Sequence, residues 1–463
     1  MGGMAGIGPM GGGASGMQEP VYVVPWRVRA PEMPPLSEGL VVYWFPSSVQ
    51  EVQKSSLRTS RLLTLYASEC VAMEIVDVAT PLGQKLAPDA KLPIAVLATH
   101  DGSLIGKAEN KNGFLKVEQV EKLVDEEYKR RENQVESQLK AAKEHVKSGD
   151  NAGAVPIYKA VLEQKCLFPK KAKDAAKALK KLGVEVAGLA DGPDLPAPIF
   201  DRVIGAKIES TMKQGLRAED AGHYLEAERL YALAHRMDPA DPTPLRFLGE
   251  VYRHEIGDWA KAREMFDAIL AMPSDPIARA IALHGNGKMT IHDGDFKKGL
   301  ALMEQSVATF STALAHRNLA VYWNSEGDGA KTDFYVHKAL DLEPHDAYNL
   351  VFAAGFMAAN GHGEEALKIA RKNEGLLPAS YNLAAIYAQL GQRDKALSLL
   401  KRHFFEYERY ESVRAKEMME ARVDAVFVSL MHDPEFLALT KGADGRLPMP
   451  QPKTMNSNGS NMF

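Results

Sequence analysis

The chain has 463 residues, 45% of them hydrophobic and 25% charged, which is typical of soluble globular domains and enough for two or three of them. Its formal net charge of −4 argues against a general nucleic-acid binder, because such proteins usually carry a strong basic excess. No apolar run approaches the length that crosses a bilayer, so no membrane span is expected.

The two cysteines, Cys70 and Cys166, are too far apart for a CxxC motif or for the paired spacing of a metal site. We expect two buried, reduced thiols, although the sequence leaves a disulfide open. Cysteine usage does not fix the compartment, although scarce cysteine fits a reducing cytosol. The expected location is cytoplasmic. A periplasmic location stays open, because a processed or mis-assigned N-terminus would hide an export signal.

Residues 1–19 are rich in Gly and Met and bury too little apolar surface to order themselves, so they are predicted to be disordered. Residues 20–128 have the pattern of one domain, in which short apolar runs are separated by helical stretches. The predicted strands are residues 21–24, 40–45, 71–78, 94–99 and 103–108. One long helix is predicted from about residue 47 to 69, and another begins near Lys116.

This order of elements resembles the thioredoxin fold. Lys91-Leu92-Pro93 stands where that family places its cis-proline loop, and Ser48-Val49-Gln50-Glu51 occupies the positions of the redox CxxC. Both sulfurs are absent, and a serine hydroxyl cannot replace a thiolate in disulfide exchange. The resemblance implies a thioredoxin-like α/β domain without redox activity. Ser48, Glu51 and Pro93 would mark a degenerate loop that could still hold an extended peptide.

Residues 129–183 are predicted to form a helical hairpin and a third helix, a degenerate form of the repeats described next. From Lys129 to Lys181 the chain has 14 basic and 6 acidic residues, a local excess of +8. Such a surface could steer an acidic partner, although Lys-rich helices are more often simply solvated. Residues 184–207 contain three prolines and are predicted to be a linker.

From about residue 208 the sequence repeats with a period near 34 residues. A small residue near the start of the second helix of each unit is followed four positions later by a second apolar residue, usually a larger one, on the same helical face. The small residues are Ala227, Ala262, Gly299, Thr332, Ala366 and Ala396. Prolines close several units, where a helix cannot continue.

These units resemble tetratricopeptide repeats, with matching first-helix residues such as Leu248-Gly249…Tyr252 and Leu383-Ala384…Tyr387. The resemblance implies six helical hairpins over residues 208–410. Long capping helices over 411–440 would cover the last hairpin, and residues 441–463 would form a disordered tail. The expected fold class is α+β multidomain: a thioredoxin-like α/β domain followed by a mostly α-helical tetratricopeptide-repeat solenoid.

Such a solenoid presents a concave groove lined by the first helix of each unit, which suits an extended peptide or a partner helix. The candidate peptide-binding residues are Arg246, Arg253, Arg317, Asn318, Tyr322, Trp323 and Asn382. Asn318 and Asn382 stand at a first-helix position that family members use to grip a peptide carboxylate. The Lys and Arg set that accompanies such an Asn is not evident in this chain.

No phosphate-binding loop, nucleophile elbow or HExxH motif is present, so we predict no catalytic residues and no cofactor. The closest histidine grouping, His284, His292 and Asp293, is a weak candidate for a metal, and no metal site is predicted. We expect a non-enzymatic scaffold that binds a partner protein or peptide in the groove, with the front domain as a second surface. Two alternatives are a constitutive structural subunit of a larger complex and a chaperone or thiol-redox helper.

Overall fold

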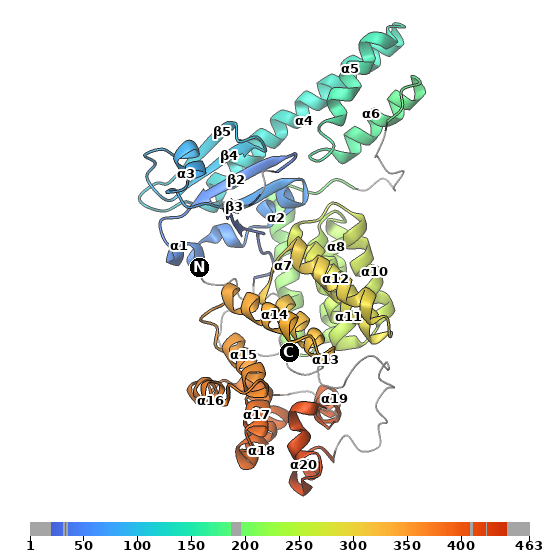
Figure 1. Ribbon diagram of the computed structural model, residues 1–463. Coiled ribbons are helices and arrows are strands. Elements are labelled where there is room, and N and C mark those ends of the chain that lie inside the picture. The colour runs from blue at the N-terminus through green and yellow to red at the C-terminus, as the bar shows by residue number, and fades with distance from the viewer. Residues whose placement is uncertain are drawn as a thin grey trace.

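The structure, a computed structural model, describes residues 20–30, 33, 36–186, 196–407, 411–422 and 424–441 (Figure 1). The segments predicted to be disordered, 1–19 and 441–463, lie outside the described residues, except for residue 441. The middle of the predicted linker also lies outside them. Among the described residues, no helix combines the length and the apolar character that a membrane span requires.

A five-stranded mixed sheet forms the front of the chain, in the order β1-β3-β2-β4-β5. The strands are β1 (Arg27–Val28), β2 (Leu40–Phe45), β3 (Val71–Ile75), β4 (Ile94–Thr99) and β5 (Leu104–Glu109). β1 and β2 both pair in parallel with β3, while β4 is antiparallel to β2 and β5 is antiparallel to β4. Every residue of β2 is buried, because apolar side chains cover both faces of the sheet.

Two predictions for this part of the chain are wrong. Residues 21–24 do not join the sheet; they lie against the helices that follow, where Arg246 donates to the Val21 carbonyl. The single helix predicted over 47–69 is three short ones: α1 (Val49–Lys54), η1 (Ser56–Arg58) and α2 (Arg61–Ser68). The break occurs because Ser55 and Ser60 each accept a backbone N–H and begin a new helix.

Three helices project from the sheet as an arm (Figure 1): α4 (Val117–Lys147), α5 (Asn151–Leu162) and α6 (Pro169–Lys181). The sheet also carries the short helix α3 (Pro81–Leu86). One hydrophobic core runs from the sheet face into the arm, including Trp44, Val124 and Leu179. Since α4 is continuous through residues 128 and 129, the boundary predicted there falls inside a helix.

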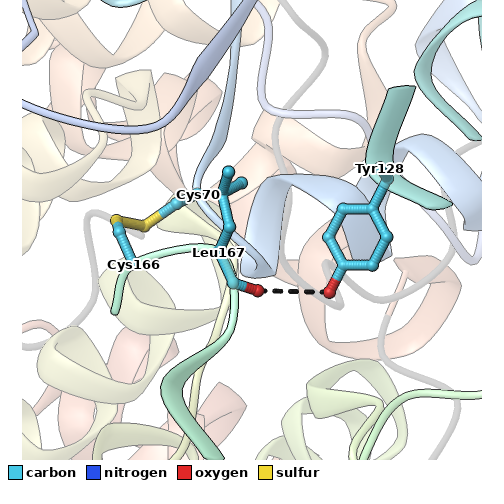
Figure 2. The surroundings of a disulfide bond; sticks show 4 residues. All are labelled: Cys70, Tyr128, Cys166 and Leu167. Atoms are coloured by element: carbon cyan, nitrogen blue, oxygen red, sulfur yellow. Dashed lines mark hydrogen bonds between the residues drawn. A yellow bond between two sulfur atoms is a disulfide. The ribbon is translucent and has the colours of Figure 1, made fainter. Parts of the chain in front are cut away.

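A disulfide between Cys70 and Cys166 fastens the arm to the sheet (Figure 2). Cys70 precedes β3, Cys166 lies in the turn between α5 and α6, and their Cα atoms are 5.6 Å apart. The Tyr128 hydroxyl donates to the Leu167 carbonyl beside it, at 3.2 Å (Figure 2). The prediction of two reduced thiols is therefore wrong. The cytoplasmic location stays a prediction.

Twelve helices from α7 to α18 form six antiparallel pairs, as the repeat pattern predicts. The pairs are α7 (Arg202–Asp220) with α8 (Tyr224–Met237), α9 (Pro242–Glu250) with α10 (Trp259–Ala271), α11 (Pro276–His292) with α12 (Phe296–Thr309), α13 (Ala313–Ser325) with α14 (Gly329–Leu342), α15 (Ala347–Ala359) with α16 (Gly363–Lys372), and α17 (Ser380–Gln389) with α18 (Arg393–Arg402).

The small residues that define the repeat are all buried between paired helices. Close approach of the helices depends on small residues: a Cβ built on Gly299 would lie 2.4 Å from the Ile291 side chain, and one built on Gly249 of the first helix α9 would lie 2.4 Å from the Phe266 ring. A π-helical segment, η2 (Val251–Ile256), extends α9, and the 3-10 turn η3 (Leu377–Ala379) precedes α17.

The cap after the last pair consists of short elements, which corrects the prediction of long helices over 411–440. These elements are η4 (His403–Tyr407), α19 (Glu411–Ala421), η5 (Ala425–Leu430) and α20 (Pro434–Leu439). Asp424 and Asp433 each accept backbone N–H groups and begin a new helix, so the chain turns twice. Phe427 and Phe436 are fully buried and join the cap to the last repeats.

Candidate protein-binding surface

The first helices of successive pairs share one surface, which we call the first-helix face. It is defined by Arg246, Glu250 and Arg253 on α9 and η2, His284 on α11, Asn318 on α13, Phe356 on α15 and Gln389 on α17. Positions 246, 250 and 253 follow the i, i+4, i+7 spacing of a single helical face. The chain itself covers both ends of this surface.

Residues 21–23 cover the front end, before the chain enters the sheet domain at Val24. Arg246 Nη2 donates to the Val21 carbonyl at 3.0 Å, and the Tyr22 hydroxyl donates to Asp241 Oδ2 at 2.8 Å. Val23 packs with Ile277, Ala280 and Phe310. A sequence-predicted peptide contact, Arg246, therefore already holds an extended segment, and that segment belongs to this chain.

Below this segment, a buried arginine joins the sheet domain to the first repeats. Arg61 of α2 forms ion pairs with Asp238 and with Asp241, and the exposed fraction of all three side chains is 1% or less. Arg61 Nη1 also donates to the Ile199 carbonyl at 2.9 Å. A buried charge is tolerated only when its hydrogen bonds are made. Here the two aspartates and the Ile199 carbonyl accept the hydrogen bonds of the guanidinium. These contacts fix α2 against the start of the repeats.

Next to the covered end lies a polar strip across three repeats. Arg253 Nη2 is 2.7 Å from Glu250 Oε2, and His284 Nε2 is 2.8 Å from Asn318 Nδ2, 34 residues further along the chain. Burial lowers the pKa of His284 to about 3, so the ring is neutral at pH 7. Because the Asn318 amide donates to Nε2, the proton of the neutral ring lies on Nδ1.

This strip has unused hydrogen-bonding capacity. Among the described residues, Arg253 Nε, His284 Nδ1 and Asn318 Oδ1 are buried without a hydrogen-bond partner. An unsatisfied buried donor or acceptor costs about 1–3 kcal/mol. These three atoms are closed off from solvent, so they are not contacts for a ligand on this surface. The underlying π-helical segment is a feature that often marks functional sites.

The other residues predicted to bind a peptide lie on α13 and α17. Arg317 Nη1 is 3.8 Å from Glu343 Oε2 and 3.3 Å from Asn349 Oδ1, and its guanidinium lies 5.2 Å from the centre of the Tyr348 ring. Arg246, Arg317, Asn318, Tyr322 and Asn382 are buried, whereas Arg253 and Trp323 are half-buried. A peptide-binding role for these seven residues stays a prediction.

The structure brings together residues that the sequence did not group. Glu250 and His254 were not singled out, yet both belong to the cluster around Arg253. His284 meets Asn318 one repeat length away rather than His292 and Asp293. The sequence signal that could have paired His284 with Asn318 is their spacing of 34 residues, which is one repeat length. Among the described residues, no three His, Cys, Asp or Glu side chains are placed to hold a metal ion.

The cap covers the back end of the first-helix face. The Tyr381 hydroxyl donates to Asp424 Oδ2 at 3.0 Å, and the Phe427 ring packs edge-on against Tyr381 with centroids 5.2 Å apart. Ser429 Oγ donates to the Ala388 carbonyl at 3.1 Å. Between α13, α15, α17 and η5 these contacts leave a cavity of about 160 Å³.

The degenerate loop of the sheet domain lies at one edge of the sheet. The pairing of Phe45 with Ile94 places Ser48 and Pro93 at the same edge, and the peptide bond before Pro93 is cis. Ser48 Oγ accepts the Glu51 N–H at 3.2 Å and begins α1. The disulfide lies at the opposite edge, because Cys70 precedes the paired starts of β2 and β3.

Comparison with known proteins supports the repeats. A family model described as tetratricopeptide repeat matches residues 212–276, and a second with the same description matches residues 379–403. The chain therefore contains tetratricopeptide repeats. It is 24% identical over 233 residues to the protein CTR9 homolog of Arabidopsis thaliana, an alignment of 39% of this chain. The chain spans about a fifth (21%) of that relative's length.

Solved structures with a similar course include a tetratricopeptide repeat protein from Parabacteroides merdae, at 15% identity, covering 66% of this chain and 98% of that one, with a TM-score of 0.36. The Cut9–Hcn1 hetero-tetramer of APC/C matches at 14% identity, covering 63% and 61%, with a TM-score of 0.34. MamA matches at 20% identity, covering 44% and 96%, with a TM-score of 0.24.

Proposed function

We propose that this chain is a non-enzymatic scaffold that binds a partner protein or peptide on its first-helix face. Tetratricopeptide-repeat proteins generally mediate protein–protein interaction and complex assembly. The observation that carries the proposal is that this face already holds two segments of its own chain, residues 21–23 and 424–430. Both are held by an inserted apolar side chain together with hydrogen bonds.

The uncovered part of the face has what a third segment would need. The cavity beside η5 offers apolar volume, and the exposed Asn324 side chain lines it. A peptide segment docked there would bury one of its own side chains.

We also propose that the sheet domain is thioredoxin-like and redox-inactive, and that it adds a second surface. The strand order and the mixed pairing support this assignment. The loop at Ser48 and Glu51 contains no sulfur, and both cysteines of the chain are bonded to each other at the far edge. An insulin-reduction assay should therefore be blank.

Site-specific photo-cross-linking tests the main proposal. A benzophenone amino acid in place of Asn324, which is exposed on α13 beside the cavity, should give protein adducts in the native source. The matched control is the same substitution at Glu364, exposed on α16, a second helix. Equal labelling from both positions, or none from Asn324, would contradict the proposal.

The native mass separates a reversible scaffold from a constitutive subunit. If the chain binds its partner reversibly, size-exclusion chromatography of a source extract should recover a free pool. A chain found only in one large complex favours the structural-subunit alternative.

A further inference from the structure

The cavity behind the polar strip has the form of a subsite for a side chain. Val321 of α13, Phe356 of α15 and Val426 of η5 supply apolar walls, and Ala359 lies exposed at its edge. Its volume of about 160 Å³ is close to that of a cavity of about 150 Å³ that binds benzene in another protein. An entering phenylalanine or leucine side chain is of matching size.

The chain itself shows what this surface accepts. In η5, Phe427 is fully buried against Tyr381, while Asp424 and Ser429 make hydrogen bonds at either end of the same short segment. A turn with a buried apolar side chain flanked by polar bonds therefore docks on α17, with Leu430 and Val426 adding to the packing. The cavity continues this intramolecular interface by one more side-chain position, since Val426 of η5 forms part of its wall.

Two side-chain amides line the cavity. Gln389 Nε2 donates to the Gly355 and Ala385 carbonyls, at 3.3 and 3.2 Å, which holds its amide in place across α15 and α17. Within the part of the chain that the structure describes, the exposed Asn324 amide makes no hydrogen bond. An amide offers both a donor and an acceptor, which matches one peptide unit of a bound segment.

We propose that this cavity is the anchor subsite for one phenylalanine- or leucine-sized side chain of a short partner-protein segment, whose backbone bonds to Asn324 and Gln389. This inference rests on the proposed function, because it names the chemistry that the first-helix face selects. A larger side chain in place of Ala359, at the cavity edge, should block the subsite without disturbing a packed core.

The probe is N-acetyl-phenylalanine amide, added to the full chain, with N-acetyl-alanine amide as the control ligand. Methyl NMR signals of Val321 and Val426 should shift with the first compound and not with the second. Ala359→Leu should weaken that binding by at least about tenfold, corresponding to about 1.4 kcal/mol. Ala330→Leu, at an exposed alanine of α14, should bind the probe as the native chain does.

Each result decides the matter. No shift either in the native chain or in a variant that lacks residues 442–463 overturns the subsite; a shift only in that variant overturns the partner segment as its occupant. Equal binding by Ala359→Leu and Ala330→Leu, with matching circular dichroism, also overturns it. If cross-links from Asn324 persist unchanged in Ala359→Leu, the proposed function stands and this anchor falls.

Discussion

In the front half of the molecule, from the sheet to α12, distant segments are joined by a disulfide and by a buried arginine between two aspartates. In the back half, from α13 to α20, they are joined mainly by aromatic and aliphatic packing, as at Phe427 and Tyr381. The buried ion pair there, Arg317 with Glu343, is longer at 3.8 Å. We infer that the front half is a fixed frame and that the back half, which contains the cavity, is the part that adapts.

Removing the disulfide is the strongest test of the fixed frame. Cys70 and Cys166 are 96 residues apart, and closing a loop of that size lowers the entropy of the unfolded chain. Replacing both by serine should lower the free energy of unfolding by up to about 4.7 kcal/mol. Guanidinium titration followed by near-UV circular dichroism measures this. A reductant should have the same effect on the native chain, and an unchanged midpoint in both experiments would refute the prediction.

Arg61→Ala should be nearly as damaging. It leaves Asp238 and Asp241 buried without their cation, which typically costs about 3–5 kcal/mol. Urea titration gives the value. If the cost comes from the orphaned charges, a triple variant with Arg61→Met, Asp238→Asn and Asp241→Asn should recover much of it. A loss below about 1 kcal/mol for Arg61→Ala would show that the two parts are not fixed by this network.

These front-half contacts show where sequence analysis stops. The repeats were predictable, because Ala227, Ala262 and their equivalents recur at helical spacing and each packs locally. Arg61 meets Asp238 across 177 residues, and no local pattern connects them. Residues 21–24 have strand-forming side chains, but the neighbour that decided their conformation is the repeat stack. Likewise Asn318 was predicted as a site residue, while its partner His284 followed only from the stacking of two repeats.

Phe427→Ala probes the packing that closes the back half. The ring is fully buried, and deletions of this kind typically cost about 3–5 kcal/mol. We expect the lower end, about 3 kcal/mol, because a short terminal segment can detach without unfolding the repeats. Hydrogen exchange should therefore rise in η5 and α17 while α9 and α10 stay protected. The control is Val428→Ala, whose side chain is 67% exposed and should change nothing. Loss of protection throughout the chain would contradict an independent back half.

A pH titration tests one buried carboxyl group of the front half. Burial raises the pKa of Glu219 in α7 to about 7, although its hydrogen bond from Tyr231 opposes the shift. The folded state then holds this proton more tightly than the unfolded state. Its stabilising contribution is complete below about pH 4.5 and is lost as pH rises through 7, at about 1 kcal/mol per pH unit. Glu219→Gln should flatten this slope in urea titrations made at several pH values. An equally steep slope in the variant would assign the effect to other groups.

The smallest effect should come from the back half's most connected surface arginine. Arg393 contacts Asp433, Asp394 and Glu435, more carboxylates than Arg61 does, and its side chain is 43% exposed. Solvent already stabilises these charges when the cation is removed, so Arg393→Ala should lower the free energy of unfolding far less than Arg61→Ala does. The loss should also shrink in 1 M salt, where screening is strong, whereas the loss caused by Arg61→Ala should not. If the two arginines had equal, salt-independent effects, burial would not be what separates the frame from the adaptable half.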